Sequence, residues 1–125
     1  MIIDTDVLVW YLNCNKKAWI AIDEAYPFSI SVVTWAELIH GVHDKQKLRQ
    51  VRDMVSGLSI RIIQIDESIS FRAMQMVEDF CLSDSLHYPD ALIAATAIEY
   101  HEPLLTGNVK HFRCIPHLEL ETFRP

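Results

Sequence analysis

Short apolar runs alternate with longer amphipathic segments along the whole chain, and this alternation constrains the fold more than any other feature. The short runs are rich in β-branched residues, and the segments that follow them carry apolar residues at helical spacing, which predicts alternating strands and helices. We expect strands near residues 2–3, 28–32, 60–65, 104–105 and 118–120. Strands connected by helices form a parallel sheet that is covered on both faces. The sequence therefore predicts an α/β fold, a three-layer α/β/α sandwich around a central, mainly parallel sheet.

The expected helices lie between these strands and differ in how apolar they are. They cover roughly residues 7–25 with a break near 13–15, then 35–42, 44–54, 67–81 and 89–100. The segment 89–100 is apolar on nearly every side, so we expect it to be deeply buried. Trp10, Trp19 and Trp35 fit a core or a dimer face better than an exposed platform for stacking bases. The 125 residues contain no repeat or linker, which predicts a single domain spanning 1–125.

The net charge of −6 argues against a protein that holds nucleic acid mainly through its overall electrostatic field. It does not exclude a nuclease, because carboxylates around a metal ion add negative charge that the bound cation neutralises. The basic residues also fall into two groups, namely Lys45, Lys47, Arg49 and Arg52, and then Lys110 and Arg113. We expect the first group to be a solvated helix face, with a phosphate-contacting rim as the alternative.

The three cysteines of the chain are far apart and show no C-x-x-C spacing, so neither a disulfide framework nor a zinc knuckle is indicated. A reducing cytoplasm suits such cysteines best. The longest apolar stretch, residues 91–98, is too short to span a bilayer, and no basic segment precedes the apolar N-terminal residues. We therefore expect a soluble cytoplasmic protein without a signal peptide and without a membrane partner.

Three acidic residues occupy positions where the parallel strands are predicted to end. Asp4 directly follows the first strand, Glu37 opens the helix after the second, and Asp90 lies in the first turn of the buried helix, behind Pro89. Residues 106–108, Thr-Gly-Asn, follow a later strand and should reach the same edge, where parallel sheets bind their ligands. Because gathered carboxylates repel each other, a hard divalent cation such as Mg²⁺ or Mn²⁺ is the usual way to hold three of them together.

Each of these acids also has a purely structural interpretation. Thr34 and Glu37 match a capping box, in which the glutamate satisfies a backbone N–H of its own helix. Asp90 could simply favour the positive end of its helix, and Asp6 could cap the first helix. Their common location at the strand ends favours the functional interpretation.

Four blocks of the sequence occur together in the order and register of one known family. They are IIDTDVL at 2–8, SVVTWAELIHGV at 31–42, PDALIAATA at 89–97 and LTGNVKHF at 105–112. Each block alone is a weak signal, but the four in this order resemble the PIN-domain family, particularly the VapC-type toxins and their FitB-like relatives. The resemblance covers nearly the whole chain and implies a PIN-like fold.

The resemblance also implies an activity. Asp4, Glu37 and Asp90 match the metal-binding acids of the family, with Thr5 or Asp6 beside them in support. The implied reaction is hydrolysis of an RNA phosphodiester by metal-activated water, with Mg²⁺ or Mn²⁺ as the cofactor. Family members commonly form homodimers and are inhibited by a small cognate antitoxin, so the resemblance implies a ribonuclease toxin of a type II toxin–antitoxin pair.

The last block departs from the family pattern. The family usually carries an acid at the position of Asn108, of His111, or of both, and here both are neutral. Asn108 can still offer a carbonyl oxygen, and His111 could bind Mn²⁺ or transfer a proton. A second metal site is therefore weakened, and we expect one firmly held cation at most, with Thr106 as a further auxiliary residue. A catalytically weakened PIN domain that acts as a binding module is the alternative.

A second enzyme class shares the N-terminal pattern. Asp4-Thr5-Asp6-Val7 fits the opening motif of haloacid-dehalogenase-like phosphatases, in which the first aspartate is the nucleophile. Those enzymes also need a lysine near the phosphate and an acidic pair after a late strand. Lys110 is the only late lysine, and no acidic pair follows 104–105, so the nuclease is favoured.

Overall fold

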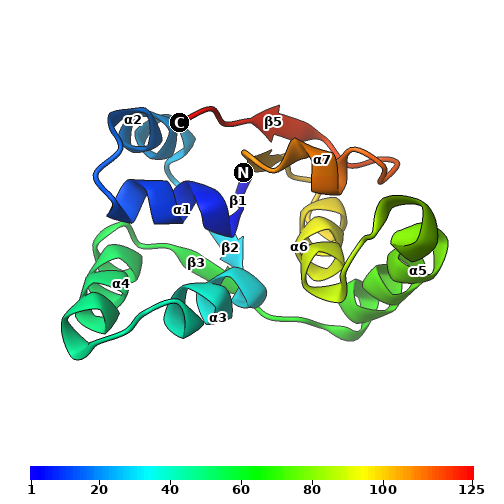
Figure 1. Cartoon of the computed structure of the whole chain (residues 1–125), viewed down its shortest axis with the longest axis horizontal. Helices are drawn as coiled ribbons and strands as arrows, with labels where there is room; N and C mark the ends of the chain where they lie inside the picture. Colours follow the sequence, from blue (N-terminus) through cyan, green and yellow to red (C-terminus); the bar gives the residue numbers. More distant parts are fainter.

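Five strands form one sheet in the computed structural model, which describes residues 1–125. Every neighbouring pair is parallel, and the spatial order is β3-β2-β1-β4-β5 (Figure 1). The strands are β1 (Ile2–Ile3), β2 (Ser29–Ser31), β3 (Arg61–Ile63), β4 (Leu104–Thr106) and β5 (Leu120–Thr122). The expected sheet is confirmed, and it is entirely parallel.

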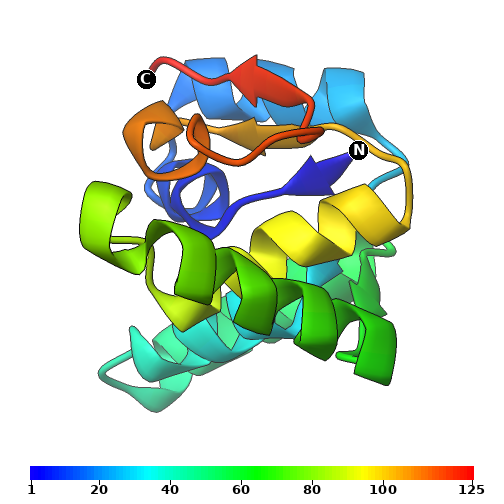
Figure 2. The ribbon, with the colours of Figure 1, turned by 90° about the vertical axis from the view of Figure 1, so that its right-hand side faces the viewer.

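Seven helices cover both faces of this sheet. They are α1 (Thr5–Leu12), α2 (Lys16–Ala25), α3 (Val32–His40), α4 (Lys45–Gly57), α5 (Glu67–Asp84), α6 (Tyr88–Glu99) and α7 (Val109–Phe112). Two apolar clusters fill the space on either side of the sheet, one beneath α1 to α4 and the other beneath α5 to α7. In Figure 2, α5 and α6 lie in front of the strands, and Figure 1 shows α1 to α4 on the opposite side. The three-layer α/β/α prediction is therefore confirmed.

The central strand β1 is only two residues long, yet its side chains pack in the apolar clusters on both faces of the sheet. Successive side chains of a strand point to opposite faces, and here Ile2 packs in the cluster under α5 and α6 while Ile3 packs in the cluster under α1 and α2. Leu104 and Leu105 of β4 divide in the same way. The backbone N–H of Asp4 donates to the Leu105 carbonyl at 2.9 Å, which carries the pairing of these strands up to the first acidic residue.

Helix α6 has the longest run of buried residues of any helix, as its composition predicts. Every residue from Ala91 to Ala97 is buried, and the four alanines in this run let the helix approach its neighbours closely. The buried hydroxyl of Thr96 donates to the Leu92 carbonyl at 2.7 Å, so it leaves no unsatisfied polar atom. The helix begins at Tyr88, one residue before the expected proline start, and Asp90 lies in its first turn.

Two C-terminal features differ from the sequence-based expectation. The last strand lies at Leu120–Thr122 instead of 118–120, because its register is set by pairing with β4, in which Leu104 faces Leu120. Helix α7 was not expected, since four residues are too few to show helical periodicity. It nevertheless anchors the chain after β4, because Phe112 is 1% exposed.

The surface corrects one interpretation of the aromatic residues. Trp10, Trp19 and Trp35 are 41%, 46% and 39% exposed, so none of them belongs to the core of this chain. All three cysteines are unpaired, as their spacing predicts. None of the helices combines the length and the apolarity that a membrane span requires.

Candidate active site

Asp4 lies at the centre of the candidate site and is almost completely buried, with 4% of its surface exposed. It is the N-cap of α1, where its Oδ1 accepts a hydrogen bond from the Thr5 backbone N–H at 2.8 Å. Its Oδ2 accepts one from the Thr106 hydroxyl at 2.7 Å. The ends of β1 and β4 thus hold this carboxylate between them. The alternative in which Asp6 caps the first helix is wrong.

Glu37 reaches the same place from α3. The Thr5 hydroxyl donates to Glu37 Oε1 at 2.7 Å, and the Thr34 hydroxyl lies 3.1 Å from Thr5 Oγ1. The cap of α3 is Ser31, whose hydroxyl accepts from the Val33 N–H at 3.1 Å. Glu37 is therefore not part of a capping box, and its exposed carboxylate is held toward α1 by a threonine that directly follows Asp4.

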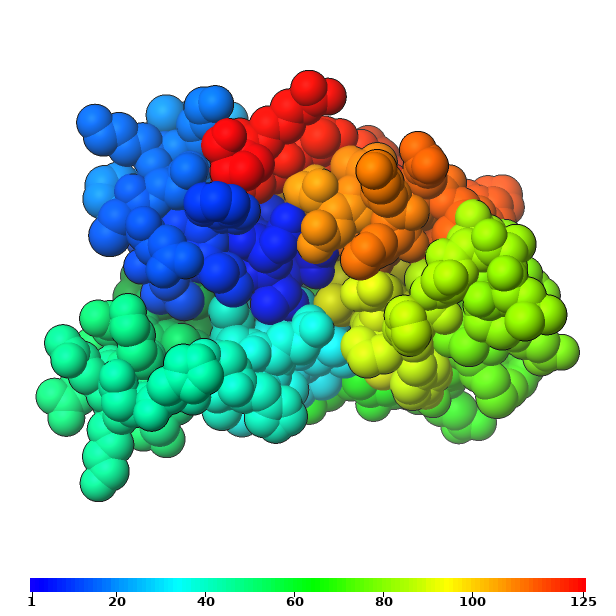
Figure 3. Space-filling view, viewed as in Figure 1, coloured from blue at the N-terminus to red at the C-terminus, as the bar shows by residue number.

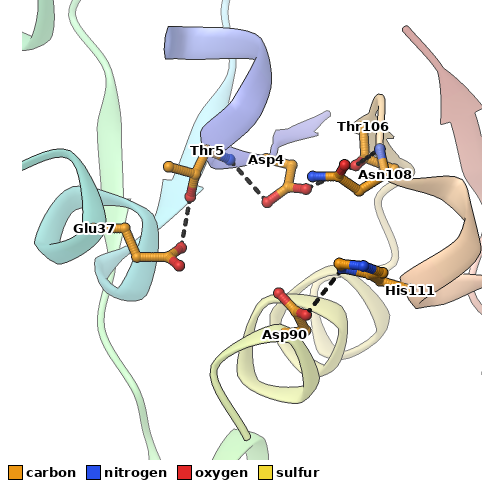
Figure 4. A network of polar contacts seen from close by, with 7 residues as sticks. All are labelled: Asp4, Thr5, Glu37, Asp90, Thr106, Asn108 and His111. Atoms are coloured by element: carbon orange, nitrogen blue, oxygen red, sulfur yellow. Dashed lines mark hydrogen bonds and ion pairs between the residues drawn. The ribbon is translucent and has the colours of Figure 1, made fainter. Parts of the chain in front are cut away.

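Asp90 contributes a carboxylate from the first turn of α6. Its Oδ2 lies 3.4 Å from Nδ1 of His111, which projects from α7. Figure 4 shows that the carboxylates of Asp4, Glu37 and Asp90 point toward a common space, which we call the carboxylate site. In Figure 3 the segments that carry them meet on one face of the molecule, beside the orange loop after β4. Four segments distant in sequence are thus brought to the carboxyl edge of the sheet.

Asp6 lies beside this site and ties α1 to the loop after β4. Its Oδ2 accepts from the Gly107 N–H at 2.9 Å, while its Oδ1 is buried and has no hydrogen-bond partner. A Cβ at position 107 would come within 2.5 Å of Asp6 Oδ2, so the contact requires glycine there. A buried carboxylate oxygen without a donor is costly, which indicates a missing positive partner near this group.

The electrostatics of the site favour a cation. The pKa of Asp4 is raised from its usual 3.8 to about 7, mainly by burial and in smaller part by the negative charges of Asp6 and Asp90, while hydrogen bonds from Thr106 and Thr5 oppose the change. Burial also raises the pKa of Asp6. These carboxylates therefore crowd one another without compensation, and a nearby divalent cation would restore their ionised form.

The carboxylate site does not form a closed metal cage. No three of the His, Cys, Asp and Glu side chains stand close enough together to hold one ion directly. Mg²⁺, however, is commonly held by one or two carboxylates and keeps several of its waters. The donors of Asp4, Glu37 and Asp90 are all carboxylate oxygens, and such donors fit a water-rich site. The donor chemistry therefore suits a hard divalent cation bound partly through water.

Thr106→Val is expected to raise the pKa of Asp4 above its present value, because the Thr106 hydroxyl donates to the ionised carboxylate. The substitution keeps the shape of the side chain and removes the donor. A pH titration of the aspartate side-chain ¹³C signals by NMR, in metal-free buffer, measures the change. Thr122→Val, on the exposed edge strand β5, is the control, and an unchanged Asp4 titration in Thr106→Val would contradict the role of this bond.

Two contributors to the site were missed by sequence analysis. Thr34 had been considered only as a capping residue, and Gly107 only as part of a loop, yet one supports Thr5 and the other binds Asp6. The spacing of Thr34 and Glu37, three residues apart and thus on one helix face, was the available signal for the first. Nothing local signals the second, because its partner is 101 positions away.

Comparison with known proteins identifies the same family as the sequence blocks. The family model described as "PIN domain" matches residues 1–116. The chain is 31% identical over 132 residues to "Ribonuclease VapC" of Rickettsia bellii, an alignment that covers 98% of this chain and 95% of that protein. Because these matches span nearly the whole chain, the haloacid-dehalogenase-like phosphatase alternative is wrong.

Solved structures agree with this result. A chain of a "Toxin-antitoxin complex from Klebsiella pneumoniae" is 31% identical, with a TM-score of 0.78 and coverage of 98% of this chain and 97% of that one. A chain of "VapBC2 from Rickettsia felis bound to a DNA fragment from their promoter" is 25% identical, with a TM-score of 0.80 and 98% of each chain covered. The fold and these matches agree, and the chain belongs to the PIN-domain family, in its VapC group.

Proposed function

We propose that this chain is a metal-dependent endoribonuclease and the toxin of a type II toxin–antitoxin pair. The observation that carries the proposal is the buried Asp4 carboxylate, with Glu37 and Asp90 facing it at the carboxyl edge of a parallel sheet. The name of the Rickettsia bellii relative, a ribonuclease that aligns over 95% of its length, supports the choice of reaction.

In this proposal each side chain of the site has a definite task. Asp4, Glu37 and Asp90 would hold Mg²⁺ or Mn²⁺, in part through water molecules of the ion, and the bound ion would lower the pKa of a water molecule and polarise the scissile phosphate. Thr106 orients Asp4, and Thr5 orients Glu37.

The residues that flank the carboxylate site position its parts but do not bind the cation in this proposal. Asp6 holds the loop at Gly107 in position, so that Asn108 and His111, and no acidic side chains, border the site from this loop and α7. A negative pair at these two positions would favour a second cation, and its absence here supports a site for one.

The proposal includes partners and a compartment. The solved relatives from Klebsiella pneumoniae and Rickettsia felis are toxin–antitoxin complexes, which supports a small antitoxin as the partner of this chain. Exposed apolar side chains at Trp10, Trp19 and Trp35 support protein contacts, including a homodimer. Unpaired cysteines suit the reducing cytoplasm, where the RNA substrate is found.

Glu37→Gln tests the proposal. Cleavage of cellular RNA is expected with Mg²⁺ or Mn²⁺, to stop when EDTA is added, and to fall at least about a hundredfold in the variant, because a neutral amide cannot offset the charge of a cation. Gel analysis of the RNA products measures the rate. Glu78→Gln, an exposed substitution on α5, is the matched control and should cleave like the parent.

The neutral Asn108 and His111 favour one specific alternative, a weakened family member that binds RNA without cutting it. In that case RNA would bind but stay intact with either metal, and His111→Asp would place an acidic side chain at the position next to Asp90 and with it restore some cleavage. Cleavage that persists in EDTA, or in Glu37→Gln, would contradict the proposed reaction.

A further inference from the structure

We infer that the pocket between residues 107–111 and 122–125 binds a backbone phosphate of the RNA strand next to the bond cleaved at the carboxylate site, with Lys110 and Arg124 as its cationic ligands. The inference rests on the proposed function. The pocket is formed where the loop after β4 and helix α7 meet the C-terminal segment. These two segments lie side by side in Figure 3, in orange and red.

The charge of this pocket is opposite to that of the protein. The chain has 17 acidic and 11 basic residues, yet the residues lining the pocket include Lys110 and Arg124 and no aspartate or glutamate. The three ion pairs of the structure involve neither cation, so both are free to contact an anion. In a protein of net charge −6, a polyanion must be held by such local groups and not by the overall field.

The position of the pocket links it to the carboxylate site. His111 lines the pocket, and its Nδ1 also lies 3.4 Å from Asp90 Oδ2. Asn108 lines it too, and its backbone N–H donates at 2.9 Å to the Thr106 hydroxyl that holds Asp4. Residues that line the pocket thus contact residues of the carboxylate site directly, as expected if the two hold neighbouring phosphates of one strand.

The other pocket that borders the site is a poorer phosphate site. It lies between α1, α3 and α4, and its lining includes the acidic Glu37 as well as the basic Lys47, so it carries no excess of basic side chains over this pair. Its remaining lining includes apolar residues such as Leu12 and Val42. Of these two pockets, only the one at α7 is lined by basic side chains without an acidic one.

An RNA phosphate suits the α7 pocket better than a protein partner does. The large exposed apolar side chains that protein interfaces use are concentrated elsewhere, and none of them lies in residues 107–125. Exposed cations that contact successive phosphates without reading bases are typical of proteins that hold a single strand. We therefore assign the pocket to the nucleic acid.

The double variant Lys110→Ala/Arg124→Ala tests the inference. Its binding to a fluorescein-labelled single-stranded RNA of mixed sequence is followed by anisotropy over a range of salt concentrations, in a Glu37→Gln background that leaves the RNA uncut. The dissociation constant should rise about tenfold at low salt. The slope of log affinity against log salt should fall by about 1.4, since each contact to a single strand contributes about 0.7.

A kinetic measurement and a matched control accompany the binding assay. Without the Glu37 substitution, the double variant should raise KM with little change in kcat, because a flanking phosphate is bound equally in the ground and transition states. Arg113→Ala removes the same charge from the residue that follows α7 but does not line the pocket. It should leave RNA affinity within about twofold of the parent.

The outcomes separate this inference from the proposed function. A parent that binds and cuts RNA, with an unchanged double variant, would overturn the pocket and leave the ribonuclease standing. An equal loss in Arg113→Ala would also overturn it, since the effect would then come from the general field. Loss of antitoxin binding with intact RNA binding would assign the pocket to a protein partner instead. A parent that neither binds nor cuts RNA would overturn both.

Discussion

Asp4→Asn is expected to slow RNA cleavage by about a thousandfold or more and, at the same time, to make the metal-free protein more stable at neutral to alkaline pH. Loss of activity follows from the loss of the most buried carboxylate of the site, since a metal ligand contributes several kcal/mol to the barrier. The gain of stability follows because the neutral amide removes a buried negative charge. Asp4 is only 4% exposed, so water screens this charge poorly from the neighbouring carboxylates.

The pH dependence of the parent gives the sign of this effect. The pKa of Asp4 is about 7 in the folded protein against a usual 3.8, so the folded state binds this proton more tightly than the unfolded state. The stabilisation is fully present below pH 3.8, is lost as pH rises through about 7, and changes no further above it. The shift corresponds to about 4 kcal/mol at most, of which we expect Asp4→Asn to recover about 2 kcal/mol.

Urea unfolding in EDTA between about pH 4 and 9 measures this prediction. The parent should lose stability over this range more steeply than Asp4→Asn, and Mg²⁺ or Mn²⁺ should stabilise only the parent at high pH, because the cation binds the ionised carboxylate. Asp23→Asn, an exposed substitution on α2, is the control. Identical pH profiles for parent and Asp4→Asn would refute the electrostatic account of the site.

Asp90→Asn is expected to abolish RNA cleavage, by about a thousandfold or more, while the fold stays intact. Asp90 is half-buried in the first turn of α6, and its side chain makes no helix-capping hydrogen bond, so asparagine can take its place with a change in unfolding free energy of about 0.5 kcal/mol or less. What the amide cannot do is offset the charge of a divalent cation, although its oxygen can still accept a hydrogen bond from the ring of His111.

Titration calorimetry with Mn²⁺ separates this effect from a loss of structure. The affinity of Asp90→Asn for the ion should fall along with its activity, while its circular dichroism and its urea midpoint stay at the parent values. Asp79→Asn, an exposed substitution on α5, removes the same charge at a position away from the site and should behave like the parent. If Asp90→Asn cleaved RNA normally, Asp90 would have no part in the reaction.

Local patterns were sufficient to predict the architecture. Alternating apolar runs predicted parallel strands with helices between them, and the unbroken apolar surface of 89–100 predicted a buried helix, because these features depend on residues a few positions apart. The strand-end rule then placed Asp4, Glu37 and Asp90 at one edge, where the structure has them.

The tertiary structure alone decided how these residues contact one another. Thr5 meets Glu37 across 32 positions, Thr106 meets Asp4 across 102, and Gly107 meets Asp6 across 101, and no periodicity records such pairs. The same holds for the register of β5 and for the burial that raises the pKa of Asp4. Patterns along a chain report which face of an element is apolar, whereas the distance between two polar atoms and the water left around them are set only when the elements pack.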